Sequence, residues 1–120
     1  MLFRSKMSLN LSRYEGWPLC SSARIAQLMG NGLLTFVSEE SGFRKFFSDD
    51  QAAFFRTEDD IVNKALEFQH DDARRQAVAA AGRAFYHEHF SGQRIVKFMV
   101  ETTLGLPYSH DYIWQDEVYR

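Results

Sequence analysis

The sequence predicts an α/β domain in which about three parallel strands alternate with helices. Three short apolar segments, residues 7–12, 33–37 and 52–55, are typical of strands, and helix signals follow each one. This alternation favours parallel pairing with right-handed crossovers. A complete doubly wound domain has about six strands, so three indicate a partial Rossmann-like three-layer unit, the second half of such a domain.

The first strand and helix have clear local signals. Residues 7–12 alternate apolar and polar side chains, as a half-buried strand does. Ser21 or Ser22 is suited to cap a helix that runs to about Met29, and the Gly-Asn-Gly at 30–32 suits its end. The apolar face of this helix consists of Ile25, Leu28 and Met29.

The middle of the chain supplies two further strands and a second helix. Residues 33–37 form a short run that is apolar except for Thr35, as expected of a strand covered on both faces. One or two helical turns are predicted at 42–47, and residues 52–55 form the third strand. Thr57 begins a sequence similar to a capping box. The helix that it opens is expected to bury Ile61, Val62, Ala65 and Leu66.

Two helices follow. Asp71 or Asp72 starts the first, which reaches about His87 and is expected to bury Val78, Ala81 and Phe85. Ser91 caps the last helix, and Gly105 ends it. The apolar stripe of this last helix consists of Ile95, Val96, Met99 and Val100.

Composition bounds the class of protein. The chain has 120 residues, 45% of them hydrophobic and 15% aromatic, which predicts a packed core. The net charge of −2, without a basic block, argues against a nucleic-acid partner. No apolar run approaches the ~20 residues of a membrane span, so no transmembrane segment is expected. One cysteine excludes an internal disulfide and suggests a reducing, cytoplasmic location.

Three groups of residues suggest other chemistry but are better explained structurally. Glu39 and Glu40 are adjacent, so in an extended chain their carboxylates point opposite ways. His87 and His89 are two residues apart, whereas helical metal ligands recur every four residues, so we expect no metal. Cys20 has no histidine nearby in the sequence and is expected to be a small apolar residue.

A phosphate site is predicted where loops leave the first two strands. The helix start at residues 21–24 offers backbone N–H groups and a positive dipole end, which suit a diphosphate. Arg13 and Arg24 are candidates for bidentate contacts with phosphate oxygens. Ser41 and Gly42 follow the second strand, where glycine permits a ligand to approach the backbone closely.

The segment around these residues resembles a known family. It reads RIAQLMGNGLLTFVSEESGFRKFF and is similar to the C-terminal segment of the glycosyl transferases group 1 family, enzymes with two facing Rossmann-like domains (the GT-B arrangement). Residues 22–32 stand where that family has a segment like S-R-I-F-E-A-M-A-C-G, and residues 42–47 stand at its G-L-E-E-L-F. The later D-D-A-R-R-Q-A-V-A-A-A-G-R-A-F also fits, so the resemblance covers residues 9–104.

The resemblance implies that this half binds a nucleotide-sugar donor without a metal cofactor. In the family a Glu usually holds the ribose hydroxyls; Gln27 takes that position here, and Leu19 takes the position of a related Glu. An amide still hydrogen-bonds a diol but brings no charge. The implied donor-binding residues are Arg13, Glu15, Ser22, Arg24, Gln27, Ser41 and Gly42.

Two functions remain open at this point. The first is the nucleotide-sugar-binding portion of a glycosyltransferase, whose catalytic base and acceptor site would lie on a missing N-terminal Rossmann-like domain. The second is a non-catalytic interaction module on the same fold. A strand so close to Met1 leads us to expect a fragment of a longer chain. Residues 1–106 form the expected domain, and 107–120 an aromatic tail that is loosely docked in the isolated chain.

Overall fold

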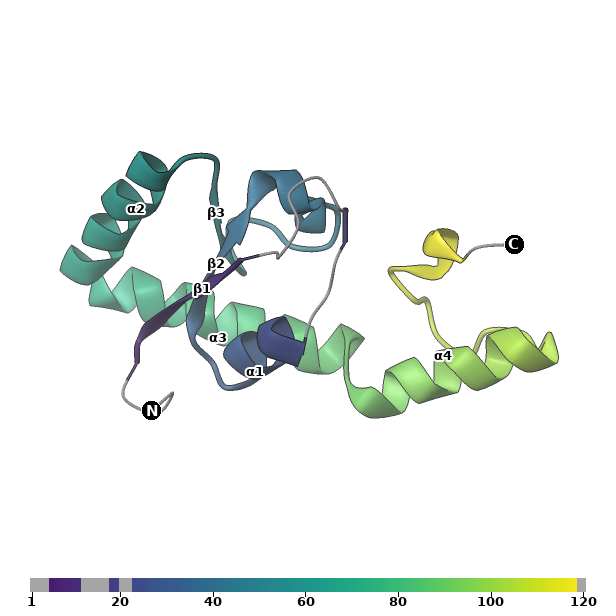
Figure 1. Ribbon diagram of the computed structural model, residues 1–120. Helices are drawn as coiled ribbons and strands as arrows, with labels where there is room; N and C mark the ends of the chain where they lie inside the picture. Colours follow the sequence, from purple (N-terminus) through teal and green to yellow (C-terminus); the bar gives the residue numbers. More distant parts are fainter. Residues whose placement is uncertain (1–4, 12–17, 20–22, 119–120) are drawn as a thin grey trace.

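The computed structural model describes residues 5–11, 18–19 and 23–118. Its elements follow the predicted order (Figure 1). They are β1 (Met7–Asn10), α1 (Ala23–Gly30), β2 (Leu34–Ser38), the short 3₁₀ turns η2 (Glu39–Ser41) and η3 (Phe43–Lys45), β3 (Ala53–Phe55), α2 (Glu58–His70), α3 (Asp72–His89), α4 (Gly92–Leu104) and η4 (Gln115–Glu117).

The three strands form one parallel sheet in sequence order, β1-β2-β3. β1 pairs with β2 so that Ser8 lies opposite Thr35, and β2 pairs with β3 so that Val37 lies opposite Phe54. Four of the five residues of the central strand β2 are buried. The predicted α/β fold, with three parallel strands and covering helices, is therefore confirmed.

Apolar clusters fill both faces of the sheet. The cluster on the α1 face, called here the α1-face cluster, consists of Ile25, Met29, Val37, Phe43, Phe47, Ala52 and Phe54. The cluster on the other face, the α2-face cluster, consists of Leu34, Phe36, Ala53, Phe55, Phe68, Val78 and Ala79. α3 packs against both, through Val78 and Ala79 on one side and Phe85 on the other.

Helix α3 contacts the chain just ahead of each strand. Ahead of β1, Arg75 Nη1 donates to the carbonyl oxygen of Lys6 at 3.3 Å. Ahead of β2 and β3, α3 lies against Gly32 and against the backbone of Gln51. α3 thus runs past the amino ends of all three strands (Figure 1).

The predicted helix ends are confirmed wherever the structure describes them. The side chains of Thr57, Asp71 and Ser91 each accept a hydrogen bond from the backbone N–H three residues later. Such caps satisfy donors that a helix start leaves without partners. Gly32, just after α1, and Gly105, after α4, adopt the left-handed conformation. Ser21 and Ser22, the predicted caps of α1, lie outside the described residues.

The predicted inner face of α2 was partly wrong. Val62 and Leu66 are exposed, and the only buried residue of this helix is Phe68, whose ring meets Phe36 edge-on at 6.4 Å between centroids. Ile61, Ala65 and Phe68 follow the i, i+4, i+7 spacing of a single helix face. The large Phe68 ring fixes the rotation of α2, and this rotation turns Val62 and Leu66 toward solvent.

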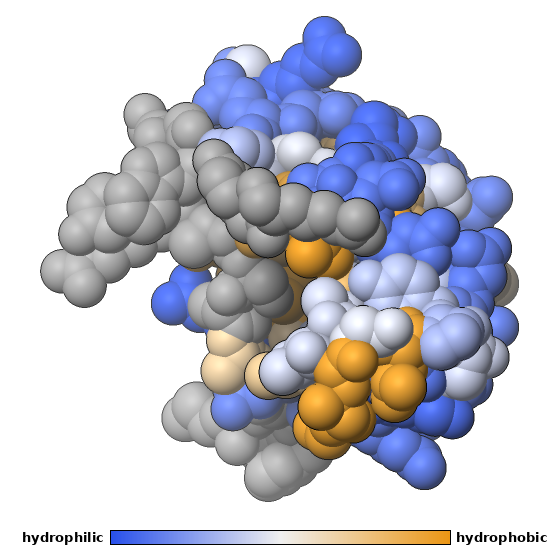
Figure 2. Space-filling model, turned by 90° about the vertical axis from the view of Figure 1, so that its right-hand side faces the viewer, coloured by the Kyte–Doolittle hydropathy of each residue, from blue (hydrophilic) through white to orange (hydrophobic). Residues whose placement is uncertain are grey.

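The last helix and the tail also differ from expectation. α4 projects away from the sheet (Figure 1), and its predicted apolar stripe is exposed: Ile95, Val96, Met99 and Val100. In Figure 1, α4 extends to the right. Figure 2 views the molecule from that side and shows apolar surface there. The opposite side of α4 packs instead against the folded-back tail, through Phe98 and Glu101.

The tail has a buried anchor, so the expectation of loose docking was wrong for its central part. Tyr112 is only 1% exposed, its ring packs against Phe98, and its hydroxyl donates to Glu101 at 2.8 Å. Hydrogen bonds from Ser109 and Tyr112 lower the pKa of Glu101. Trp114 stacks on Phe90, at the end of α3, and so joins the tail to the main body.

Candidate functional site

The carboxyl ends of the parallel strands lie together along one border of the sheet, called here the carboxyl edge. Two helices start at this edge, and their first turns differ in charge. α2 begins directly after β3, and its first turn carries three acidic residues, Glu58, Asp59 and Asp60. The first turn of α1 carries no acidic residue. A helix start attracts anions through its positive dipole end and its N–H groups. Of these two helices, α1 is therefore the one suited to an anionic ligand.

Arg24 adds a positive charge beside the end of β1. This exposed residue lies in the first turn of α1, and its Nη1 donates to the carbonyl oxygen of Leu11 at 3.1 Å. Leu11 directly follows β1. The contact places the guanidinium at the carboxyl edge, as the sequence predicted.

The loop after β2 is tied together by serine hydroxyls. Ser41 Oγ donates to the carbonyl oxygen of Ser38 at 2.6 Å and accepts from the Phe43 N–H at 3.4 Å. Gly42 has φ +77°, a conformation that side chains other than glycine rarely adopt. The loop is thus a compact turn whose glycine is required by backbone conformation.

The segment before α1 contacts this same turn. The Leu19 N–H donates to the carbonyl oxygen of Ser41 at 2.7 Å. Leu19 itself has φ +56°, which is uncommon for a residue with a branched side chain. The loops that follow β1 and β2 therefore meet at one edge of the sheet.

Four of the predicted site residues are described, and three of them lie at this edge. Arg24, Ser41 and Gly42 occupy the edge itself. Gln27 is exposed on α1, about one helical turn farther from the edge. The other three predicted residues lie outside the described residues: Arg13, Glu15 and Ser22.

Asn10, the last residue of β1, was not among the predicted site residues. Asn10 is 8% exposed, and its side-chain oxygen Oδ1 is buried without a hydrogen-bond partner. Asparagine is uncommon in strands, and a buried amide usually has a partner. The sequence carries no signal of this, because Asn10 alternates with Leu9 as in an ordinary half-buried strand.

Glu39 has a structural partner. Arg44 donates to both of its carboxylate oxygens, with Nη2–Oε1 at 2.6 Å and Nε–Oε2 at 2.8 Å, and this lowers the pKa of Glu39. Arg44 also lies over the ring of Phe54, 4.4 Å from its centroid. Glu39 therefore anchors the loop and is not one of a pair of catalytic carboxylates.

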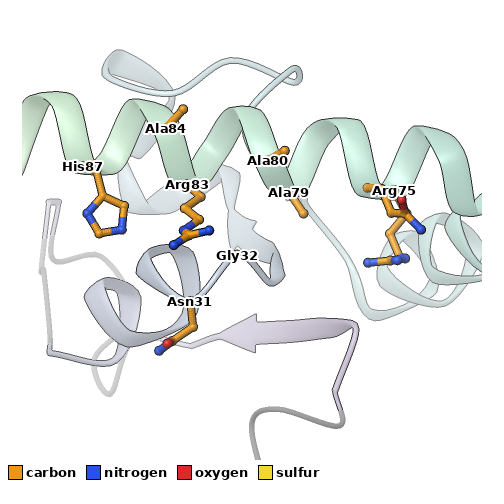
Figure 3. A pocket seen from close by; sticks show the side chains of 9 residues that line it. Asn31, Gly32, Arg75, Ala79, Ala80, Arg83, Ala84 and His87 are labelled. Atoms are coloured by element: carbon orange, nitrogen blue, oxygen red, sulfur yellow. The ribbon is translucent and has the colours of Figure 1, made fainter.

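An open groove of about 680 Å³ lies away from this edge, between α3 and the end of α1 (Figure 3). Arg83 and His87 point from α3 toward α1 and Asn31, and His87 Nε2 is 3.1 Å from the carbonyl oxygen of Gly30. The groove adjoins the amino end of β2. Ligands of open parallel sheets bind beyond the carboxyl ends of the strands. We therefore place the candidate site at the carboxyl edge.

The described residues contain neither a cluster of metal ligands nor a membrane span. Within residues 5–11, 18–19 and 23–118, no three His, Cys, Asp or Glu side chains are grouped so as to hold a metal ion. None of the helices in that same part of the chain combines the length and the apolar character needed to cross a membrane.

Comparison with known proteins identifies the family. No curated protein and no solved structure matches the chain significantly. A family model described as "Glycosyl transferase-like" matches residues 1–101. This match includes both loops of the carboxyl edge and all of the sheet. By that match, which extends over most of its 120 residues, the chain belongs to the glycosyl transferase-like family.

Proposed function

We propose that this chain is the nucleotide-sugar-binding portion of a glycosyltransferase. The observation that carries the proposal is the meeting of the two loops at the carboxyl edge, beside the start of α1. Family membership supports a role in glycosyl transfer in general. The low cysteine content agrees with action in a reducing compartment such as the cytoplasm.

In this proposal, positive charge on the protein stabilises the diphosphate of the donor. The start of α1 and Arg24 supply that charge, and neither needs a metal ion. Ser41 and Gly42 bring backbone close to the ligand at the end of β2. Catalysis of this kind rests on positioning and on electrostatic stabilisation of the leaving group. An acceptor site and a catalytic base would come from a second Rossmann-like domain.

A nucleotide titration tests the proposal. We expect uridine, guanosine, adenosine or thymidine diphosphate to shift the amide NMR signals of Arg24, Gln27, Ser41 and Gly42 before any others. The reason is that these residues surround the proposed diphosphate position. The measurement is a ¹⁵N–¹H titration with each nucleotide, with and without EDTA, which is expected to leave the affinity unchanged.

A matched pair of arginine variants controls this titration. Arg24→Gln removes a charge at the carboxyl edge and is expected to weaken binding about tenfold, the value of one charge-assisted hydrogen bond. Arg83→Gln removes the same charge from the groove at the opposite end of α1 and is expected to leave the affinity unchanged. Shifts gathered around Arg83 and His87 would refute the site.

The alternative is a non-catalytic interaction module on the same fold. Two observations favour it: Leu19 and Gln27 stand where the family usually has Glu, and α4 exposes an apolar stripe. Only the nucleotide-sugar-binding function requires residue 27 to contact the ribose of a ligand.

Gln27→Glu separates the two functions. If the chain binds a nucleotide sugar, a carboxylate at this exposed position of α1 is expected to tighten ribose recognition by about three- to tenfold, because a charged acceptor bonds hydroxyls more strongly than an amide. The measurement compares nucleoside diphosphates with their 2′,3′-dideoxy forms. Equal affinity of both proteins for both forms would favour the interaction module.

A further inference from the structure

Asn10 places a polar side chain in a buried position where its oxygen has no hydrogen-bond partner. It is the last residue of β1, 8% exposed, and no hydrogen bond satisfies its buried side-chain oxygen. Among the described residues only one other buried side-chain atom, Nδ1 of His89, lacks a partner. A buried carbonyl oxygen without a donor costs free energy, and an apolar side chain of similar shape does not.

The register of the sheet defines where the Asn10 side chain lies. Asn10 is paired with Val37, and Val37 belongs to the α1-face cluster. Paired residues of parallel strands share a face of the sheet. The amide therefore lies on the α1 face, at the carboxyl end of β1, where Arg24 contacts Leu11.

Ser8 provides an internal comparison. It lies on the same face of β1, two residues nearer the amino end, opposite Thr35. Its hydroxyl lies 3.3 Å from the Thr35 hydroxyl and 3.4 Å from the carbonyl oxygen of Leu34. The sheet thus satisfies the polar side chain of β1 that is far from the carboxyl edge. The polar side chain at the edge is the one left without a partner.

We propose that the side-chain oxygen of Asn10 accepts a hydrogen bond from a hydroxyl of the bound nucleotide-sugar donor. This inference rests on the proposed function and adds a recognition residue to it. A carbonyl oxygen repels phosphate and attracts O–H groups, so the partner of Asn10 Oδ1 is a neutral hydroxyl of the donor. Arg24 and the start of α1 then face the diphosphate. Such local conflicts with folding are concentrated at functional sites.

The test compares Asn10→Leu with wild type in the full chain. Leucine matches the shape of asparagine but cannot bond a hydroxyl. Without ligand, the melting temperature is expected to rise, because the buried oxygen without a partner is gone. Affinity for UDP-glucose, or for the nucleoside diphosphate that gives the largest shifts in the panel, is expected to fall about tenfold. A second variant, Asn10→Ala, removes the amide without adding bulk and is expected to show the same loss of affinity.

Comparing different ligands shows which hydroxyl of the donor bonds to Asn10. A variant effect that disappears with the 2′,3′-dideoxy nucleotide assigns Asn10 to the ribose. An effect that appears only with a nucleotide sugar, such as UDP-glucose, assigns it to the transferred sugar. Ser8→Ala is the control and is expected to leave affinity unchanged.

Failure of this inference is distinguishable from failure of the proposed function. Wild-type chain that binds no member of the panel, UDP-glucose included, overturns both. Wild-type chain that binds, with unchanged affinity in both Asn10 variants, overturns only the role of Asn10. A fall in melting temperature in both variants overturns it as well, because the amide would then have a structural partner.

Discussion

Replacing Gly82 with alanine is expected to lower the free energy of unfolding by about 3 kcal/mol. A Cβ at this position would lie 2.3 Å from the carbonyl oxygen of Gln51 and 3.2 Å from Cε of Met29. The Met29 methyl group can move, but the Gln51 carbonyl belongs to the backbone just ahead of β3. Relief of the clash must therefore displace either α3 or the start of the strand. Urea unfolding followed by circular dichroism measures the effect.

Gly92→Ala is the matched control. Gly92 is the first residue of α4, and a Cβ there would meet nothing within 4 Å. Alanine loses less conformational freedom on folding than glycine, so this variant is expected to be neutral or more stable by up to about 1 kcal/mol. Equal stability of the two variants would show that α3 does not approach Gln51 as closely as described.

The second large effect is expected for Phe54→Ala, at about 3–5 kcal/mol of lost stability. Phe54 is fully buried at the centre of β3, opposite Val37, and belongs to the α1-face cluster. Its removal leaves a cavity between the sheet and η3, and also removes the ring beneath the Arg44 guanidinium. Thermal and urea unfolding measure the loss.

Val62→Ala, measured beside Phe54→Ala, tests the orientation of α2 that the structure shows. Val62 is 56% exposed, so its truncation is expected to change stability by less than about 0.5 kcal/mol. A loss of 1 kcal/mol or more would mean that Val62 faces the core, as its place in the sequence pattern first suggested.

The features predicted correctly from sequence are those set by a few neighbouring residues. Thr57 and Ser91 cap helices because their hydroxyls reach N–H groups only three residues away. Leu34–Ser38 is a strand buried on both faces because it carries apolar side chains on each of them, Leu34 and Phe36 on one and Val37 on the other. The rotation of α2 depends instead on the contact between Phe68 and Phe36, which are far apart in the chain.

The packing of the tail was also missed because it depends on contacts between separate segments of the chain. Its aromatic residues show no helical or strand periodicity, so nothing in the sequence pairs Tyr112 with Glu101. The pairing arises because Gly105 ends α4 in the left-handed conformation and lets the chain turn back along the helix. Edge-on packing against Phe98 then buries the ring.

At the candidate site, the sequence located the edge but not its full chemistry. Arg24, Ser41 and Gly42 were predictable because parallel strands place their following loops together. Asn10 was not, because its alternation with Leu9 fits an ordinary half-exposed strand. Only the three-dimensional structure shows that this polar position is buried and unpaired.

The path of α3 across the amino ends of the strands determines how late the domain becomes stable as it is synthesised. Ser8 and Thr35 are only 27 residues apart, so β1 and β2 are able to meet early. Leu34 and Phe36 nevertheless remain partly uncovered until Val78 and Ala79 have been made. Since α3 also brings Phe85 to the other face, its arrival completes both layers in one step. A nascent chain that stops at His70 therefore holds all three strands and still lacks a closed core.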